Sequence, residues 1–366
     1  MTTSFRRAIA PSGAAQITFP GAFALDSGAE LPELTLAYRT WGTLDDDGAN
    51  AIVVTHGLTG SPDVTQWWPA LVGPGRALDP ARDFIVCVNV PGSCYGSSGP
   101  LTPAPDGKPW GKRFPRVTVR DMVRAQMLLL DALGVQRVRL VVGGSLGGMQ
   151  ALEFALLDTR VEAVAAIAAP ARHEAWAIAW SEAQRRALAA DPAWHKDGDA
   201  QAGLAAARAI AMISYRSPAN LATRFGRTAG VRSPYAVQDW LAHHGQALND
   251  RFDARSYSVL LDAMDAHDLG ANRGGLDRAL RSVRVPVLVV AIDSDHLYPP
   301  AESEALSALL PDSQLVRSSS PHGHDAFLID APEMEQLVRA FRDRLSADAP
   351  YSEAPLQRAL RAGGAA

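Results

Sequence analysis

Short apolar runs rich in valine and isoleucine recur along most of the chain, separated by polar and glycine-containing stretches. Their length and composition are typical of strands that are buried on both faces. They occupy residues 50–57, 83–92, 137–144, 161–170, 285–295 and 313–320. Helical spacing of apolar residues lies between most of them, at 119–133, 148–157, 301–310 and 332–345. The alternation predicts an α/β fold, with a mostly parallel sheet and helices on both faces.

One long stretch departs from this alternation. From about residue 172 to residue 268 the sequence contains amphipathic segments typical of helices and no convincing strand. These segments are HEAWAIAWSEAQRRALAA, AGLAAARAIAMISY, PANLATRFGR, VQDWLAHHGQALND and SYSVLLDAMDAHDL. We therefore expect residues 1–171 and 273–366 to form a core domain and residues 172–272 to form an inserted helical lid. The C-terminal APLQRALRAGGAA is expected to be a frayed tail.

Composition narrows the class of protein. The 366 residues suit one large domain with an insertion, or two domains. Hydrophobic residues make up 47% and charged residues 20%, which is ordinary for a globular enzyme. The net charge of −4 gives no indication of a nucleic-acid or anionic-membrane partner. The two cysteines, Cys87 and Cys94, are too few for a disulfide framework.

The N-terminal sequence MTTSFRRAIAPSG has basic residues but lacks the apolar core of a signal peptide. No stretch of the chain approaches the ~18 apolar residues of a membrane span. We therefore expect a cytoplasmic protein that has no membrane partner.

A serine stands among four glycines in LVVGGSLGGMQALEFALL, between a predicted strand and a predicted helix. The residues Gly143-Gly144-Ser145-Leu146-Gly147 match G-x-S-x-G, the nucleophile elbow of the α/β-hydrolase fold. Such a sharp turn is expected to hold Ser145 in strained dihedral angles, with small neighbours that let the backbones pass closely. The alternative is a glycine-rich turn with a capping serine, but a strand before it and a helix after it favour the nucleophile.

A similar pattern surrounds Cys94. The stretch Gly92-Ser93-Cys94-Tyr95-Gly96 also follows a strand, and a thiol could serve as a nucleophile. About twenty residues without a helix come after it. We therefore expect Cys94 to be a structural or lining residue.

A serine nucleophile needs a base and an acid that orients the base. In this fold the chain order is serine, acid, histidine. The acid is expected at the end of the strand at 285–295, where Asp295 lies farther out than Asp293. Among the histidines that follow this strand, His296 adjoins the acid and is expected to point away, and the loop SSSPHGHDAFL offers His322 and His324. The residues alone leave these last two open.

The tetrahedral oxyanion needs two backbone N–H donors. One is expected at Leu146, directly after the nucleophile, and the other at Leu58 in the loop THGLTGSP after an early strand. His56 in that loop is expected to be a packing residue.

Long stretches of the sequence resemble the homoserine O-acetyltransferase family over nearly the whole chain. They are HGLTGS, WWPALVGPGRALDPARDFIVCVNVPGSCYGSSGP, VTVRDMVRAQ, VVGGSLGGMQALE, RFDARSY, DSDHLYPP and HGHDAFL. The resemblance implies an α/β-hydrolase fold with a helical lid, dimerisation through that lid, and acyl transfer from acyl-CoA to an amino-acid hydroxyl. It places the catalytic histidine at His324 and the acid at Asp295.

The resemblance also implies two acceptor-binding residues. The family arginine that binds the homoserine carboxylate matches Arg227 in TRFGRT, and the acid that meets the amino group matches Asp325. The lid departs from the family pattern at Trp240 and Thr228. Acetyl or succinyl as the acyl group, and homoserine, serine or another alcohol as acceptor, therefore stay open.

The sequence thus predicts a ping-pong acyltransferase that moves an acetyl group from acetyl-CoA, a co-substrate, to L-homoserine. No other cofactor and no metal site is expected. An esterase that uses the same Ser145, Asp295 and His324 with water as acceptor is the main alternative. A binding protein without catalysis is a second alternative, but it would be expected to have lost one of these three residues.

Overall fold

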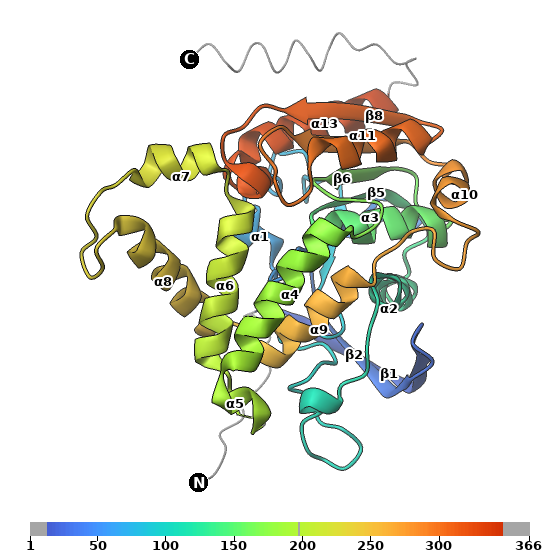
Figure 1. Ribbon diagram of the computed structural model, residues 1–366. Coiled ribbons are helices and arrows are strands. Elements are labelled where there is room, and N and C mark those ends of the chain that lie inside the picture. Colours follow the sequence, from blue (N-terminus) through green and yellow to red (C-terminus); the bar gives the residue numbers. More distant parts are fainter. Residues whose placement is uncertain (1–12, 197, 347–366) are drawn as a thin grey trace.

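The computed structural model describes residues 13–196 and 198–346. An eight-stranded sheet runs through the molecule in the order β1-β2-β4-β3-β5-β6-β7-β8 (Figure 1). The strands are β1 Ala15–Ala24, β2 Glu30–Trp41, β3 Ala51–Thr55, β4 Phe84–Val88, β5 Val138–Gly144, β6 Val164–Ile167, β7 Val287–Ile292 and β8 Ser313–Ser318. From β4 to β8 all neighbours are parallel. Members of this group lie within the six apolar runs of the sequence, so the predicted parallel sheet is confirmed.

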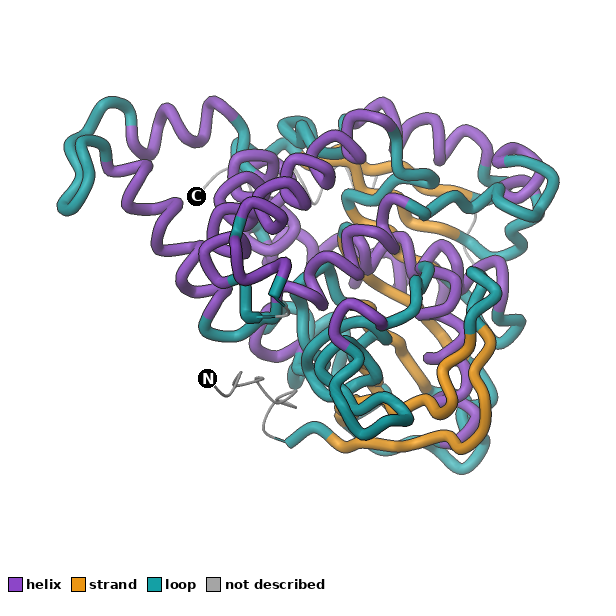
Figure 2. The backbone as a smooth tube through the Cα atoms, turned by 60° about the horizontal axis from the view of Figure 1, so that its bottom comes forward, coloured by secondary structure: helices purple, strands orange, loops and turns teal. Residues whose placement is uncertain are grey.

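Helices cover both faces of the sheet, as Figure 2 shows. The helices of the core are α1 Val64–Trp67, α2 Val119–Ala132, α3 Leu146–Leu157, α10 Leu276–Arg281, α11 Pro300–Leu309, α12 Ala326–Ile329 and α13 Ala331–Ser346, with short 3₁₀ turns η1 Gly111–Arg113 and η2 Gly323–Asp325. Alternate residues of β3 divide between two hydrophobic cores: Val53 joins the core on α2 and α3, and Val54 joins the core on α1 and α13. A strand buried on both faces therefore reads as a continuous apolar run.

The N-terminal strands β1 and β2 were not among the apolar runs of the sequence. They form an antiparallel pair at one edge of the sheet, and β2 pairs antiparallel with β4. Most of β1 is exposed, and β2 buries residues such as Leu34 and Leu36 in alternation with residues that are less buried. A search for continuous apolar runs does not detect this alternation, which is typical of a sheet with one solvent-exposed face.

Between β6 and β7 the chain forms helices with no further strand among the described residues. The helices that precede α10 are α4 Ala175–Ala190, α5 Pro192–His195, α6 Gln201–Tyr215, α7 Pro218–Phe225, α8 Ala236–Asn249 and α9 Ala254–Asp265. We call α4–α9 the lid. Figure 1 shows α4, α6 and α9 packed together beside the sheet, with α7 and α8 projecting away from it.

The lid joins the core through a narrow neck where its two ends lie side by side. The His173 N–H donates to the carbonyl of His267 at 2.9 Å, and the Leu269 N–H donates to the carbonyl of Ala171 at 3.1 Å. The chain therefore enters and leaves the lid at one place, and the lid lies within the range 172–272 expected for the insertion.

No helix among residues 13–196 and 198–346 is long and apolar enough to cross a membrane. The expectations for the N-terminal sequence up to residue 12 and for the tail APLQRALRAGGAA lie outside the described residues.

Candidate active site

Ser145 stands at the turn between β5 and α3. Its dihedral angles, φ 57° and ψ −127°, are rare for a residue with a side chain, as expected for a nucleophile elbow. The Ser145 N–H donates to the carbonyl of Ile167 on the neighbouring strand β6 at 2.9 Å. Ser145 is only 7% exposed to solvent. The turn is therefore held by the sheet on one side and by the start of α3 on the other.

The glycines of the elbow are required by the close approach of β3. A Cβ atom at Gly143 would lie 2.2 Å from Thr55 Oγ1, and one at Gly147 would lie 2.1 Å from the Thr55 carbonyl oxygen. The Thr55 hydroxyl uses this space to donate to the carbonyl of Gly147 at 2.7 Å. Small residues thus let a hydrogen bond tie the elbow to β3.

His324 and Asp295 meet at the ends of the last two strands. Asp295 follows β7 and His324 lies in η2, after β8. The Nδ1 atom of His324 lies 2.7 Å from Oδ2 of Asp295, and both side chains are nearly fully buried. Asp293 is exposed and faces Arg317 instead, at 3.8 Å. The structure therefore brings together the acid and the histidine that the sequence favoured.

Backbone groups hold the acid in place. The second oxygen of Asp295, Oδ1, accepts hydrogen bonds from the N–H groups of Leu297 at 2.8 Å and Tyr298 at 3.0 Å. The Ser294 hydroxyl donates to the carbonyl of Ser320 and accepts from the Gly323 N–H at 2.9 Å. Sequence reasoning missed Ser294, although its place between the two aspartates was a signal. It fastens the acid loop to the histidine loop.

The His324 imidazole is enclosed by aromatic rings. Tyr215 and Tyr298 lie with their ring centroids 5.6 Å and 5.1 Å from it, and Phe327 lies at 5.7 Å. Burial lowers the pKa of His324, but the charge and hydrogen bond of Asp295 and the charge of Asp325 outweigh burial and raise the pKa above 6.5. The Nε2 atom has no hydrogen-bond partner among the described residues, so it is available to accept a proton.

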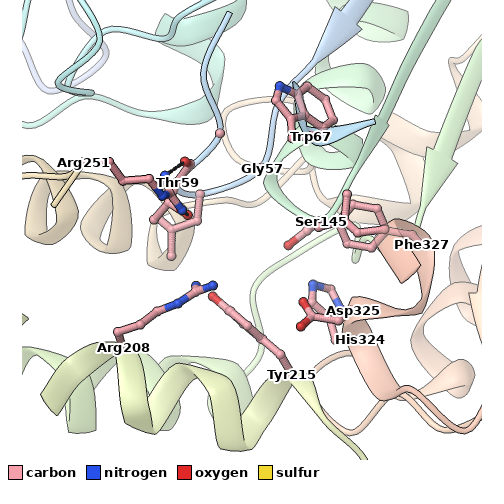
Figure 3. Close-up of a pocket in the computed structure, with 13 residues that line it drawn as sticks. Gly57, Thr59, Trp67, Ser145, Arg208, Tyr215, Arg251, His324, Asp325 and Phe327 are labelled. Atoms are coloured by element: carbon pink, nitrogen blue, oxygen red, sulfur yellow. Dashed lines mark hydrogen bonds between the residues drawn. The ribbon is translucent and has the colours of Figure 1, made fainter. Parts of the chain in front are cut away.

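Ser145 and His324 face one pocket, with a cavity volume of about 160 Å³ (Figure 3). Arg208 and Tyr215, from α6, lie across this pocket from Ser145, and Thr59 and Arg251 lie at its other side. No hydrogen bond joins the Ser145 hydroxyl to His324 in the part of the chain that the structure describes. Two of the three predicted catalytic side chains, Ser145 and His324, thus line one pocket, and the third, Asp295, contacts His324 from outside it.

The expected oxyanion donors flank the same pocket. Leu58 lines it, and the N–H groups of Leu58 and Leu146 donate no hydrogen bond to any described residue. His56 is buried beneath this loop, and burial lowers its pKa to about 4, so its ring is neutral. Its Nε2 accepts from the Val90 N–H at 3.2 Å, which leaves Nδ1 to donate to the Gly57 carbonyl at 2.8 Å. His56 therefore supports the loop from below.

An arginine from the lid holds the same loop from the other side. Arg251 follows α8 and donates to the Thr59 carbonyl at 2.6 Å, to the Thr59 hydroxyl at 3.1 Å and to the Tyr95 hydroxyl at 2.8 Å (Figure 3). Sequence reasoning did not single out Arg251, although it begins the RFDARSY stretch. The contact links the lid to the expected oxyanion loop.

Charged side chains gather next to His324. Asp325 lines the pocket and forms an ion pair with Arg216 at 3.1 Å, and both side chains are largely buried. Arg208 also lines the pocket, half-buried, with its guanidinium 5.5 Å from the ring centroid of Tyr215. No ion pair or hydrogen bond of the Arg208 guanidinium is found among the described residues. The pocket thus contains an acid and a guanidinium that a ligand could contact.

The structure does not bring Arg227 to this pocket. Arg227 lies beyond the end of α7, exposed, where its guanidinium donates to the Tyr235 hydroxyl at 2.8 Å and lies over the Tyr235 ring. The chain leaves α7 at Gly226 with φ 50°, in the part of the lid that projects from the core. Arg227 thus does not line the pocket, whereas Arg208 lines it and Arg216 contacts Asp325. The expectation that Arg227 binds the acceptor stays a prediction.

The competing residues lie elsewhere. Cys94 is buried and does not line the pocket, and burial raises its pKa to about 12, which suits a structural residue. The Nδ1 atom of His322 accepts from the Asn220 side chain at 2.9 Å, away from Asp295. His296 is exposed. In the described ranges, no group of three or more His, Cys, Asp or Glu side chains is arranged to hold a metal ion.

Comparison with known proteins agrees with this geometry. The family described as "alpha/beta hydrolase fold" matches residues 50–331. A homoserine O-acetyltransferase from Nostoc punctiforme is 48% identical over 336 residues, which cover 88% of this chain and 94% of the relative.

Two solved structures share the fold. Esterase E22 superposes with a TM-score of 0.82 at 25% identity and covers 90% of this chain and 100% of its own. The homoserine O-acetyltransferase from Bacillus anthracis has the same TM-score at 22% identity, over 90% of this chain and 98% of its own. The fold, the identity and the coverage together show that the chain belongs to the homoserine O-acetyltransferase family of the α/β-hydrolase fold and is an enzyme of that type.

Proposed function

We propose that this enzyme transfers an acetyl group from acetyl-CoA to the hydroxyl of L-homoserine by a ping-pong reaction through an acyl-serine. The observation that carries the proposal is the 2.7 Å contact between His324 and Asp295, with Ser145 facing the same pocket. A relative that is 48% identical over 88% of this chain is a homoserine O-acetyltransferase. Both agree with acyl transfer from a serine nucleophile.

In the first half-reaction the Ser145 oxygen attacks the thioester carbonyl, and the Ser145 proton passes to Nε2 of His324. The free Nε2 and the neighbouring Asp295 suit this step, because the carboxylate stabilises the imidazolium that forms. The N–H groups of Leu58 and Leu146 hold the oxyanion. The carbon–sulfur bond then breaks, and the thiolate of CoA takes the proton from His324.

In the second half-reaction the acceptor hydroxyl gives its proton to His324 and attacks the acyl-serine carbonyl. The same two N–H groups hold the second oxyanion. The Ser145 ester bond then breaks and Ser145 recovers the proton from His324, so the enzyme returns to its starting state. The products are CoA and O-acetylhomoserine.

Charge in the pocket supports an amino-acid acceptor. A zwitterion needs a carboxylate for its ammonium and a cation for its own carboxylate, and these must lie side by side. Asp325 and its ion-pair partner Arg216 meet this need beside His324, and Arg208 adds a guanidinium directly in the pocket. We propose that Asp325 binds the ammonium and that Arg216 and Arg208 bind the carboxylate.

Hydrolysis is the second candidate, because the solved esterase E22 has the same fold at a TM-score of 0.82. An esterase would use the same three residues with water as acceptor. The charged pair Arg216–Asp325 favours transfer, because a simple acetate ester or water presents no carboxylate and no ammonium for it to bind.

Self-association through the lid is a further part of the proposal. Several large apolar side chains of the lid are exposed: Trp176, Ile178, Ile213, Val231 and Tyr235. Val231, in the loop between α7 and α8, is 97% exposed. A second copy that covers these side chains would bury them from water, so we propose a homodimer joined through the lid.

The test is to incubate the purified enzyme with acetyl-CoA, with and without homoserine, and to measure free CoA and O-acetylhomoserine together. We expect one O-acetylhomoserine for each CoA released, and slow CoA release without homoserine. Equal CoA release in both samples, with acetate as product, would replace transfer by hydrolysis. Serine and succinyl-CoA in parallel samples decide between the acceptors and between the acyl groups.

A further inference from the structure

A second acid–histidine–hydroxyl chain lies behind the proposed catalytic residues. The Nδ1 atom of His173 lies 3.0 Å from Oδ1 of Asp265, and its Nε2 atom lies 3.0 Å from the Tyr298 hydroxyl. Arg185 holds the other oxygen of Asp265 at 2.6 Å. His173 and Tyr298 are buried. Both ring nitrogens of His173 and both carboxylate oxygens of Asp265 thus have a polar partner, as a buried network requires.

The protonation of this chain follows from its partners. Burial raises the pKa of Asp265, but the hydrogen bonds from His173 and Arg185 outweigh burial and lower it, so Asp265 is ionised and only accepts. Nδ1 of His173 therefore donates to Asp265. Burial raises the pKa of the Tyr298 phenol, which stays protonated, and its hydroxyl lies 3.0 Å from Nε2 of His173, within hydrogen-bonding distance.

This hydrogen-bond network joins the lid to the proposed catalytic pair, Asp295 and His324. Asp265 ends α9 and Arg185 lies on α4, two lid helices that pack side by side (Figure 1). His173 lies at the neck, where its N–H bonds to His267. Tyr298 lies in the acid loop of the core. Its backbone N–H donates to Asp295 at 3.0 Å, and its ring meets the His324 ring edge-on at 5.1 Å.

We propose that His173 is a positioning residue, which fixes Tyr298 through its hydroxyl and thereby holds Asp295 and His324 in their reactive arrangement under control of the lid. The inference rests on the proposed catalytic role of His324. Tyr298 is the connecting element, because it contacts Asp295 through its backbone N–H and His324 through its ring. His173 decides where that ring lies, because it binds the Tyr298 hydroxyl. A shift of α4 or α9 would move Arg185 or Asp265 and, through His173, the side chain of Tyr298.

The two informative variants are Tyr298→Phe and His173→Ala. Tyr298→Phe removes only the hydroxyl and keeps the ring against His324, so it should fold even if His173→Ala folds poorly. We expect each variant to lower kcat about tenfold, which corresponds to about 1.4 kcal/mol, with an unchanged KM for the acceptor. The double variant should be no slower than His173→Ala, because both changes break the same contact. The exposed His296, next to Asp295 in sequence, supplies the control His296→Ala, with wild-type kcat.

A readout that does not depend on turnover completes the test. The imidazole of His324 is titrated by NMR with ¹³C-labelled histidine, assigned through His324→Gln, in wild type and in Tyr298→Phe. We expect a lower pKa of His324 in Tyr298→Phe, because the contact with Asp295 loosens. An unchanged titration together with unchanged kcat would overturn the proposal, even if the melting temperature falls. If wild type forms no O-acetylhomoserine, the proposed acceptor fails, and the titration still decides the role of His173.

Discussion

The Nδ1 atom of His324 lies 2.7 Å from Oδ2 of Asp295, whereas the opposite ring nitrogen, Nε2, has no hydrogen-bond partner among the described residues. One side of the imidazole is therefore fixed and the other faces the pocket that contains Ser145. A general base that acts between an acid and a hydroxyl requires this orientation of the ring.

The pH dependence of acylation should report this environment. The proposed role of His324 as general base needs its neutral form. Asp295 and Asp325 raise the pKa of His324 above 6.5, so activity should fall as the pH falls through a midpoint above 6.5. Replacing Asp325 by Asn removes one of the charges that raise the pKa, and the acid limb should move to lower pH. Acylation rates with p-nitrophenyl acetate, measured from pH 5 to 9, check this. An acid limb that moves to higher pH in the variant would contradict the assignment.

The two histidines of the HGHD stretch should differ sharply. His324→Ala should lower turnover by a factor approaching about 10⁶, and the double variant with Ser145→Ala should be little worse, because the two residues act as one unit. His322 bonds to Asn220 and does not contact Asp295, so His322→Ala should keep turnover within a few-fold of wild type. Steady-state rates for these variants are the measurement, and a larger loss for His322→Ala would reverse the assignment.

Acceptor recognition should depend on Arg216 rather than on Arg227. Truncating one partner of a buried charge pair typically costs ~2–5 kcal/mol, so Arg216→Ala should weaken kcat/KM for homoserine more than tenfold. Arg227→Ala, at the exposed end of α7, is the matched control and should leave it unchanged. Arg208→Ala should also raise KM for homoserine. Pre-steady-state acylation by acetyl-CoA should remain nearly intact in Arg216→Ala, because CoA does not present that carboxylate. Loss of homoserine transfer in Arg227→Ala alone would restore the sequence-based expectation.

The loop that carries Leu58 should depend on the lid through Arg251. Its guanidinium donates twice to Thr59, so Arg251→Ala should misplace the oxyanion donor and slow both half-reactions by a similar factor, about tenfold. Thr59→Val removes only the hydroxyl acceptor and should have a smaller effect. Rapid-quench measurement of acylation and deacylation distinguishes a misplaced oxyanion donor from a defect in acceptor binding. A defect in acceptor binding would slow only the second half-reaction.

The parallel core could be predicted from the sequence because its strands are buried on both faces and read as apolar runs. The nucleophile elbow was equally visible, since Gly143 and Gly147 must stay small where Thr55 passes. The edge strands β1 and β2 were missed because one of their faces is wet. The spacing of apolar residues reflects which side chains are buried, so a strand with few buried side chains is hard to recognise in the sequence.

The charged part of the site could not be predicted in the same way. Arg216 and Arg227 both lie near the end of a predicted lid helix, and nothing in the spacing tells which one faces the core. The direction is decided by how α6 and α7 turn, with Arg216 directed to Asp325 and Arg227 to Tyr235. The support of Asp295 by Tyr298, His173 and Asp265 likewise joins residues far apart in the chain.

The measurement that tests the central claim most directly is the fate of the acyl group on Ser145 within one turnover. Enzyme is mixed with a substoichiometric amount of acetyl-CoA, quenched at intervals and analysed by peptide mass spectrometry, with Ser145→Ala and Cys94→Ser in parallel. We predict one acetyl group on the peptide that contains Ser145 in wild type and in Cys94→Ser, none in Ser145→Ala, and its transfer to homoserine when homoserine is added. An acetyl group that forms in Ser145→Ala, or that maps to Cys94, would contradict the account.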